Sequence, residues 1–162
     1  MNRLIRLGVA TALALTSTLA ISQAGPPSPE AQAKTAIEAR QAAFKLISNQ
    51  FGPLSGLARG QQVDAAVAAR NAERIQVLAG MLPELFQRDT REFKSINTAA
   101  LDGIWNSQAD FKSKAEALQT AAGKLAAAAK GGDATAMAAA GREIGGACGA
   151  CHDAFRAKPP GR

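Results

Sequence analysis

Two helical segments joined by a pair of glycines account for residues 104–155, which read IWNSQADFKSKAEALQTAAGKLAAAAKGGDATAMAAAGREIGGACGACHDAF. In the first segment, apolar residues recur every seven positions and alanines fill the neighbouring row: Ile104, Phe111, Leu118 and Leu125, with Ala115, Ala122 and Ala129. A seven-residue repeat is typical of helices that pack at shallow angles. Gly131-Gly132 ends this pattern, and Asp133 is suited to cap the next helix. We therefore expect one helix from near Gly103 and another after Asp133.

The N-terminal half of the chain carries two more amphipathic patterns. Ser28-Pro29-Glu30 combines a capping hydroxyl, a proline at the first helical position and an acid near the positive end of the helix dipole. One side of this helix carries Ile37, Arg40, Phe44, Ile47 and Phe51. After the break at Gly52-Pro53, a second helix is expected from about Gln61 to Leu78 or beyond, and Pro83 should bend or end it. Its apolar side carries Val67, Ile75, Leu78 and Leu82.

These patterns predict an all-α chain, an antiparallel four-helix bundle with two short connections and one long one. The long connection spans residues 88–102 and has room for a short helical turn. No segment alternates apolar and polar residues over the length of a strand. Large apolar side chains are few for a domain of this size, with six Phe, one Trp and no Tyr. A bulky apolar cofactor would complete so thinly filled a core.

The first 24 residues have the features of a secretory signal. Arg3 and Arg6 precede an apolar stretch, and Ser22-Gln23-Ala24 supplies small residues for cleavage after Ala24. No later stretch is apolar over a membrane-spanning length. Residues 25–162 then form one domain. Without Arg3 and Arg6, 17 of the 19 basic residues remain, and with 13 acidic residues they give a net charge of +4. With no basic cluster interleaved with aromatic residues, nucleic acid is not an expected partner.

The two cysteines and the single histidine of the chain lie together in Cys148-Gly149-Ala150-Cys151-His152. This C-x-x-C-H spacing is the attachment signature of a c-type haem. The two thiols add to the porphyrin vinyl groups as thioethers, and the histidine reaches the iron. Positions i, i+3 and i+4 share one face of a helix. Cys148, Cys151 and His152 are therefore expected to face the same cofactor, within the last helix and before Pro159-Pro160-Gly161 stops it.

Other uses of these residues stay open at this point. A structural zinc site needs about four ligands, and the chain offers two Cys and one His. A redox disulfide of the thioredoxin type belongs in a strand–helix context, which the sequence lacks. A haem-free helical module with a disulfide is a further alternative, and a red colour of the purified protein would exclude it.

The opposite side of the iron has no obvious protein ligand. Met137 lies fifteen residues before His152 on the same helix, about 22 Å along its axis. Met81 could serve only if the end of the second helix faced the iron, and it is expected in the core as a gap-filler. Arg40 interrupts the apolar stripe of the first helix, where a buried charge needs a partner such as a haem propionate. Alternatively, its side chain extends to solvent at the edge of the stripe.

The whole chain after residue 24 resembles the cytochromes c′, the class II c-type cytochromes. The resemblance rests on Ala39-Arg40-Gln41-Ala42-Ala43-Phe44, on Ile104-Trp105 and on Cys148 to Arg156. It implies haem thioethers at Cys148 and Cys151. It also implies the following roles: His152 as sole axial ligand with Arg156 beside it, Arg40 at a propionate with Gln41 near it, and Trp105 packed near the haem.

The same resemblance places Phe44 on the distal side of the iron. This position is usually a bulky apolar residue in the family, and it is a ligating Met in a low-spin subset. Phe44 cannot ligate, so five-coordinate, high-spin iron is expected. Because Phe is larger and stiffer than Leu, CO binding should be hindered, whereas NO should still enter.

The function expected from the sequence is that of a periplasmic haem protein with one haem c that binds NO and can carry one electron. No catalytic acid or base is apparent, so an enzyme is not expected. The rival is a dedicated low-spin electron-transfer cytochrome with Met81 as sixth ligand. The resemblance also implies a homodimer through the first two helices, for which an outer row of alanines is suited: Ala65, Ala66, Ala69 and Ala72. The sequence does not identify the redox partner protein. No association with a membrane is expected after cleavage of the signal.

Overall fold

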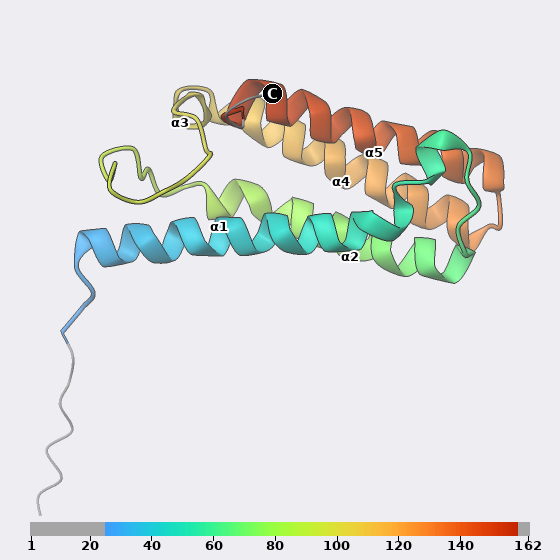
Figure 1. Cartoon of the computed structure of the whole chain (residues 1–162), viewed down its shortest axis with the longest axis horizontal. Coiled ribbons are helices and arrows are strands. Elements are labelled where there is room, and N and C mark those ends of the chain that lie inside the picture. Colours follow the sequence, from blue (N-terminus) through green and yellow to red (C-terminus); the bar gives the residue numbers. More distant parts are fainter. Residues whose placement is uncertain (1–24, 159–162) are drawn as a thin grey trace, which may run out of the picture.

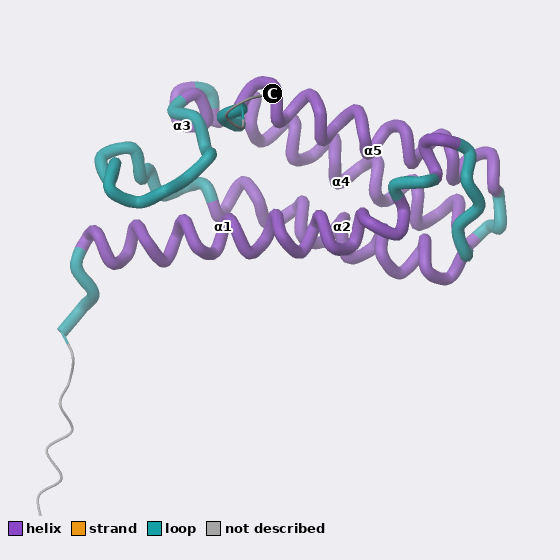
Figure 2. Tube along the Cα trace, viewed as in Figure 1, coloured by secondary structure: helices purple, strands orange, loops and turns teal. Residues whose placement is uncertain are grey.

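The computed structural model describes residues 25–158, so the expected signal (residues 1–24) and the stop at Pro159-Pro160-Gly161 lie outside it. Four long helices, α1 (Pro29–Phe51), α2 (Ala65–Leu85), α4 (Gln108–Lys130) and α5 (Ala134–Phe155), run alternately in opposite directions (Figure 1). The short elements are η1 (Gly52–Leu54), η2 (Leu57–Arg59) and α3 (Gly103–Asn106). No strand occurs within residues 25–158 (Figure 2). The expected all-α, antiparallel four-helix bundle is therefore confirmed.

Side-chain caps set where three of the long helices begin. Ser28 Oγ accepts the N–H of Ala31 at 3.2 Å, and Asp133 Oδ1 accepts that of Ala136 at 2.9 Å. The second helix begins at Ala65 rather than near Gln61, because Asp64 Oδ1 accepts the N–H of Val67 at 2.9 Å. An unpaired N–H at a helix start is satisfied by such a cap, so the capping residue fixes the boundary.

The helix expected to run unbroken from Gly103 is divided. α3 ends at Asn106, and Ser107 leaves the helical region with φ −137° and ψ 54°. The N–H of Ser107 still donates to Gly103 O at 2.9 Å, and Ser107 O accepts the N–H of Phe111 at 3.0 Å. The break turns α3 away from α4 without leaving these backbone groups unpaired.

Alanine dominates the core where α2 packs against α4, and it lets the two helices approach closely. Ala68, Ala72 and Ala79 of α2 are fully buried, as is Ala122 of α4. The expectation that Ala72 belongs to an outer row is therefore wrong. So is the expectation that Met81 fills the core, because its side chain is 47% exposed. A helix with small apolar residues on several sides has no single sequence stripe that identifies its buried face.

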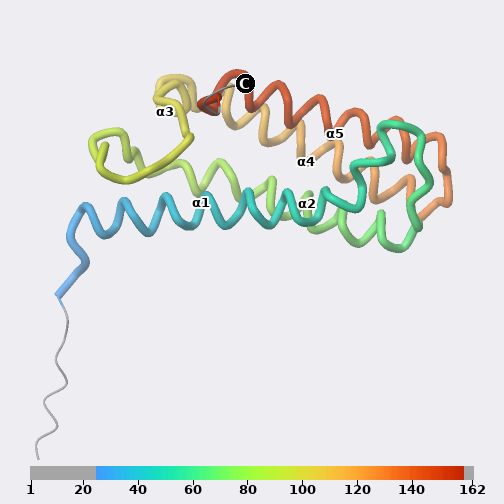
Figure 3. The backbone as a smooth tube through the Cα atoms, viewed as in Figure 1, coloured from blue at the N-terminus to red at the C-terminus, as the bar shows by residue number. Residues whose placement is uncertain are grey.

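Each long helix packs closely only against the long helix that comes before or after it in the chain, so α1 and α5 are not in close contact. Contacts between α1 and α2, α2 and α4, and α4 and α5 hold the bundle together. At the end of α5 the chain is joined to the long connection: Leu101 N donates to Phe155 O at 2.9 Å, and Ala157 N donates to Ala99 O at 2.8 Å. Figure 3 shows this end of α5 beside α3. The open side of the bundle is thus closed at one end by residues 86–102.

Candidate functional site

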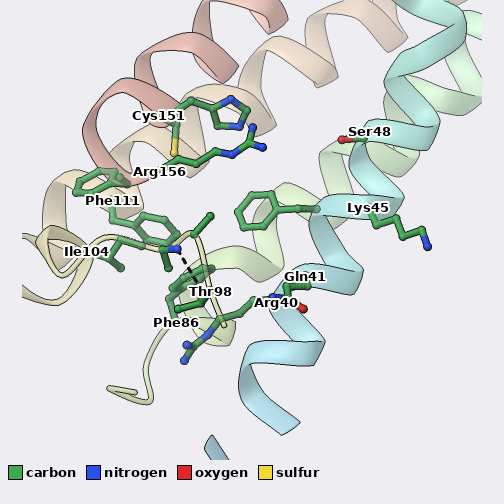
Figure 4. Close-up of a pocket in the computed structure, with 15 residues that line it drawn as sticks. Arg40, Gln41, Lys45, Ser48, Phe86, Thr98, Ile104, Phe111, Cys151 and Arg156 are labelled. Carbon is green, nitrogen blue, oxygen red and sulfur yellow. Dashed lines mark hydrogen bonds between the residues drawn. The ribbon is translucent and has the colours of Figure 1, made fainter. Parts of the chain in front are cut away.

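A cavity of about 300 Å³ opens between α1 and α5. Its lining comes from α1, the connection after α2, α3, and the ends of α4 and α5: Arg40, Gln41, Phe44, Lys45, Ser48, Phe86, Thr98, Ala99, Ala100, Ile104, Phe111, Cys151, His152, Phe155 and Arg156. In Figure 4, Gln41 and Ser48 on α1 lie across the cavity from Cys151 and Arg156. The cavity therefore lies between the first and the last long helix of the bundle.

Aromatic rings form a continuous wall of the cavity. Phe86, directly after α2, lies at its centre, with ring centroids 6.1 Å from Phe44 and 4.7 Å from Phe111. Phe111 in turn meets Phe155 edge-on at 5.5 Å. Tilted and edge-on ring pairs at these separations attract one another. The wall is thus apolar and joins α1, α2, α4 and α5.

The cysteines and the histidine lie on the α5 side. Cys148 and Cys151 are half-buried free thiols, one helical turn apart. Cys151 and His152 line the cavity, whereas Cys148 packs against the hydrophobic core one turn earlier. Burial raises the pKa of both thiols. Burial, and then the charge of Arg156, lowers the pKa of His152, which favours the neutral imidazole that binds metals.

Arg40 is buried in the cavity wall, with 3% of its surface exposed, so it does not extend to solvent. Its Nε donates to Leu85 O at 2.8 Å, one Nη to Thr90 Oγ1 at 2.9 Å and the other to Arg88 O at 2.6 Å. Burial lowers the pKa of Arg40, and an arginine remains charged despite such a shift. The partners of this buried charge are neutral oxygens at the end of α2 and in the segment that follows it.

The other expected site residues occupy different positions around the cavity. Gln41 lines it, and its Nε2 donates to Asn97 O at 3.1 Å. Arg156 lies at the rim, in the bridge that pairs it with Ala100. Trp105 is not among the lining residues. It stands behind Phe86, with ring centroids 6.2 Å apart.

Sequence reasoning missed Phe86 and the segment Thr98–Ala100. Pro83, three residues before Phe86, predicts a bend or an end of the helix, but not the direction in which the ring points. In the structure α2 continues through Pro83 to Leu85. Residues 98–100 carry no motif at all. They reach the cavity through backbone bonds to the end of α5, which no local pattern reveals.

The comparisons with known proteins agree with this geometry. A model of the family described as cytochrome C′ matches residues 35–156. The chain belongs to the cytochrome c′ family. A cytochrome c′ of Rubrivivax gelatinosus is 41% identical over 124 residues, covering 76% of this chain and 95% of the relative. A cytochrome c-554 of Cereibacter sphaeroides is 34% identical over 149 residues, covering 91% and 96%.

Solved cytochrome c′ structures share the fold. The crystal structure of the Rubrivivax gelatinosus protein has a TM-score of 0.67 at 40% identity and covers 76% of this chain and 96% of that one. The ferric cytochrome c prime of Alcaligenes xylosoxidans has a TM-score of 0.68 at 34% identity, with coverages of 78% and 97%. Within residues 25–158 no helix is long and apolar enough to cross a membrane.

The cofactor of this family is haem c, and the residues present fit it. Cys148 and Cys151 are free thiols at the spacing that two thioethers need. The cavity beside them has an apolar, aromatic wall suited to a porphyrin. No group of three or more His, Cys, Asp or Glu side chains in the described part of the chain is placed to hold a metal ion by itself.

Proposed function

We propose that this protein is a periplasmic c-type haem protein with five-coordinate, high-spin iron, which binds NO, hinders CO and can pass one electron. In this proposal it is a binding and electron-transfer protein rather than an enzyme. Haem supplies an iron with an open position for a diatomic ligand. The protein supplies the attachment, one axial ligand and the apolar surroundings.

The attachment and ligation are assigned to the end of α5. Cys148 and Cys151 carry the thioethers, and His152 is the axial ligand. The exposed Arg156 guanidinium, one turn after His152, is the basic residue beside the imidazole. Since burial and Arg156 both lower the pKa of His152, the imidazole is available in its neutral, ligating form at neutral pH.

The observation that carries the proposal is that Phe44 lines the cavity while no methionine does, among the residues described. A phenyl ring cannot ligate iron, and next to Phe86 it gives no hydrogen-bond donor to polarise bound O₂. It also helps to exclude water. NO needs no such donor, so a crowded apolar wall favours NO and disfavours stable O₂ storage. Nitric oxide complexes have been crystallised for variants of the Alcaligenes xylosoxidans cytochrome c prime, which supports this assignment.

The low-spin alternative required Met81 as sixth ligand. Met81 is 47% exposed on α2 and does not line the cavity. Met137 is buried in the core, fifteen residues before His152 on the same helix. Both positions favour the five-coordinate assignment.

The test is the optical spectrum of the purified holoprotein, ferric and dithionite-reduced, alone and with NO and CO. We expect a broad high-spin ferrous Soret band that changes strongly on adding NO and weakly on adding CO. Sharp, split α and β bands that ignore both gases would overturn the proposal and favour the dedicated electron-transfer protein.

We also propose a homodimer through α1 and α2. An apolar strip is exposed on these two helices, with Leu46 at 51%, Val77 at 65% and Met81 at 47%. Leu46 and Val77 line a shallow hollow rimmed by Arg70, Glu73 and Arg74. Contiguous apolar surface with a polar rim is typical of a protein interface. A second copy of the chain, which brings both charge signs to the same rim, is the proposed occupant.

A further inference from the structure

We propose that Arg40 is a positioning residue that clamps the end of α2 and so holds the Phe86 ring in the wall of the cavity. This inference rests on the proposed function, because it explains how the wall that restricts gas binding is kept in place. It differs from a direct contact between Arg40 and the haem, since it assigns the guanidinium a task within the polypeptide.

The clamp consists of three hydrogen bonds from one side chain of α1. The Nε of Arg40 donates to Leu85 O, the last residue of α2, and one Nη donates to Arg88 O three residues later. The other Nη donates to Thr90 Oγ1. The planar guanidinium holds its donors in a rigid fork, so these acceptors are fixed relative to one another. The chain from Leu85 to Thr90 is thereby tied to α1.

Phe86 belongs to the segment from Leu85 to Thr90 that these hydrogen bonds tie to α1. The guanidinium carbon of Arg40 stands 4.6 Å from the centre of its ring, within cation–π range. Behind the ring, Trp105 Nε1 donates to Phe86 O and Arg88 O, each at 3.1 Å. Phe86 is only 4% exposed. Both its backbone and its ring are held, so the wall is formed by the polypeptide itself.

The placement of Arg40 also accounts for its buried charge. The final carbonyls of a helix lack intrahelical partners and carry a partial negative charge. The Arg40 cation at this end of α2 interacts favourably with that partial charge, and its Nε donates a hydrogen bond to Leu85 O. A guanidinium has five N–H donors, and these bonds use three of them.

Substitution of Thr90 distinguishes the role of Arg40 in holding the end of α2 from a direct contact of Arg40 with haem. The Thr90 hydroxyl accepts a hydrogen bond from Arg40, but Thr90 does not line the cavity. Thr90→Val keeps the shape of the side chain and removes one acceptor. Arg40→Lys keeps the charge and removes the fork. The matched control is Asn71→Ala, which deletes a buried bond between α2 and Gln50 O of α1 at a site outside the cavity lining.

Each holoprotein variant is examined in two ways: hydrogen–deuterium exchange of the peptide spanning residues 84–94, and CO affinity of the ferrous form. We expect Thr90→Val to accelerate exchange in this peptide and to raise CO affinity between about twofold and tenfold, the range that one buried hydrogen bond corresponds to. Arg40→Lys should do both more strongly. Asn71→Ala should change neither, although it lowers the unfolding temperature.

Two results would overturn the clamp. One is a Thr90→Val variant with unchanged exchange and unchanged CO affinity, whether or not Arg40→Lys alters them, since Arg40 would then act directly on the haem. The other is an Asn71→Ala control that moves both readouts equally, which would indicate general loosening. If no form of the protein binds gas, the proposed function fails, while exchange of residues 84–94 still decides the clamp.

Discussion

The ring of Phe44 on α1 lies 6.1 Å from the ring of Phe86 at the end of α2, with 60° between the ring planes. These residues are far apart in sequence, yet they form one apolar surface opposite the cysteine and histidine side of the cavity. This part of the cavity wall is therefore built from a residue within α1 and the residue directly after α2, and not from the α1 position alone.

The first prediction concerns the size of the residue at position 44. Phe44→Leu and Phe44→Ala should raise CO affinity of the ferrous protein in that order, with at least about a tenfold gain for Ala, or about 1.4 kcal/mol. The reason is that each step removes bulk from the wall. CO titration followed by the Soret band measures the effect. Equal affinities in all three proteins would show that Phe44 does not restrict the site.

The second prediction concerns Met81. Met81→Leu should leave the ferric and ferrous spectra unchanged, because the side chain is exposed on α2 and lies outside the cavity lining. Absorption spectra of wild type and variant at equal haem content provide the comparison. A spectral change from low-spin to high-spin on substitution would identify Met81 as the sixth ligand.

The third prediction concerns attachment of the cofactor. Replacing both Cys148 and Cys151 by Ser should abolish covalently bound haem, whereas each single replacement should leave one thioether. Denaturing electrophoresis followed by haem staining shows whether haem stays on the chain. The pyridine haemochrome spectrum distinguishes one thioether from two. Stained bands from the double variant would contradict the assignment.

The fourth prediction concerns the contact between η2 and α5. A Cβ at Gly141 would lie 2.7 Å from Leu57 Cβ and 3.4 Å from Ala58 N, so the packed segments would have to separate. Gly141→Ala should therefore lower the free energy of unfolding by about 1–3 kcal/mol. Gly146→Ala on the same helix is the control, since a Cβ there meets nothing within 4 Å.

Relief of glycine's conformational entropy should make the Gly146→Ala control more stable by about 0.5–1 kcal/mol. Denaturant unfolding of the two variants and wild type measures both effects. Similar stabilities for Gly141→Ala and Gly146→Ala would show that η2 does not pack against α5 as closely as the structure has it.

The fifth prediction concerns self-association. Val77→Asp places a charge at the centre of the exposed apolar strip and should weaken the dimer, while the gas-binding spectra stay the same. Thr120→Asp, at an exposed position of α4, is the control and should leave association unchanged. Sedimentation equilibrium reports the association constants. A monomeric wild-type protein would refute the proposed interface.

The helices and the haem attachment could be predicted from local patterns. Caps such as Asp133 mark helix starts by residue type, and the seven-residue repeat of α4 marks its buried side. The two cysteines and the histidine lie within one helical turn, so the backbone of α5 alone brings them to one region. Short-range geometry decides each of these features.

Features that depend on alanine-rich helices were harder to predict. Met81 is exposed and Ala72 is buried, contrary to expectation. Small apolar residues occupy several faces of α2, so burial depends on which neighbour each face meets. The break at Ser107 likewise occurs without a proline or glycine at that position, between α3 and α4.

The amino-acid sequence by itself determined the presence of four long helices, the attachment chemistry of haem c and the absence of a ligating side chain at position 44. Tertiary structure alone decided what Arg40 binds and where Phe86 points. The acceptors of Arg40 lie 45 to 50 residues away, and two of them are backbone carbonyls. Every residue has such a carbonyl, so no residue type reveals it, and only the packing of α1 against the end of α2 brings donor and acceptors together.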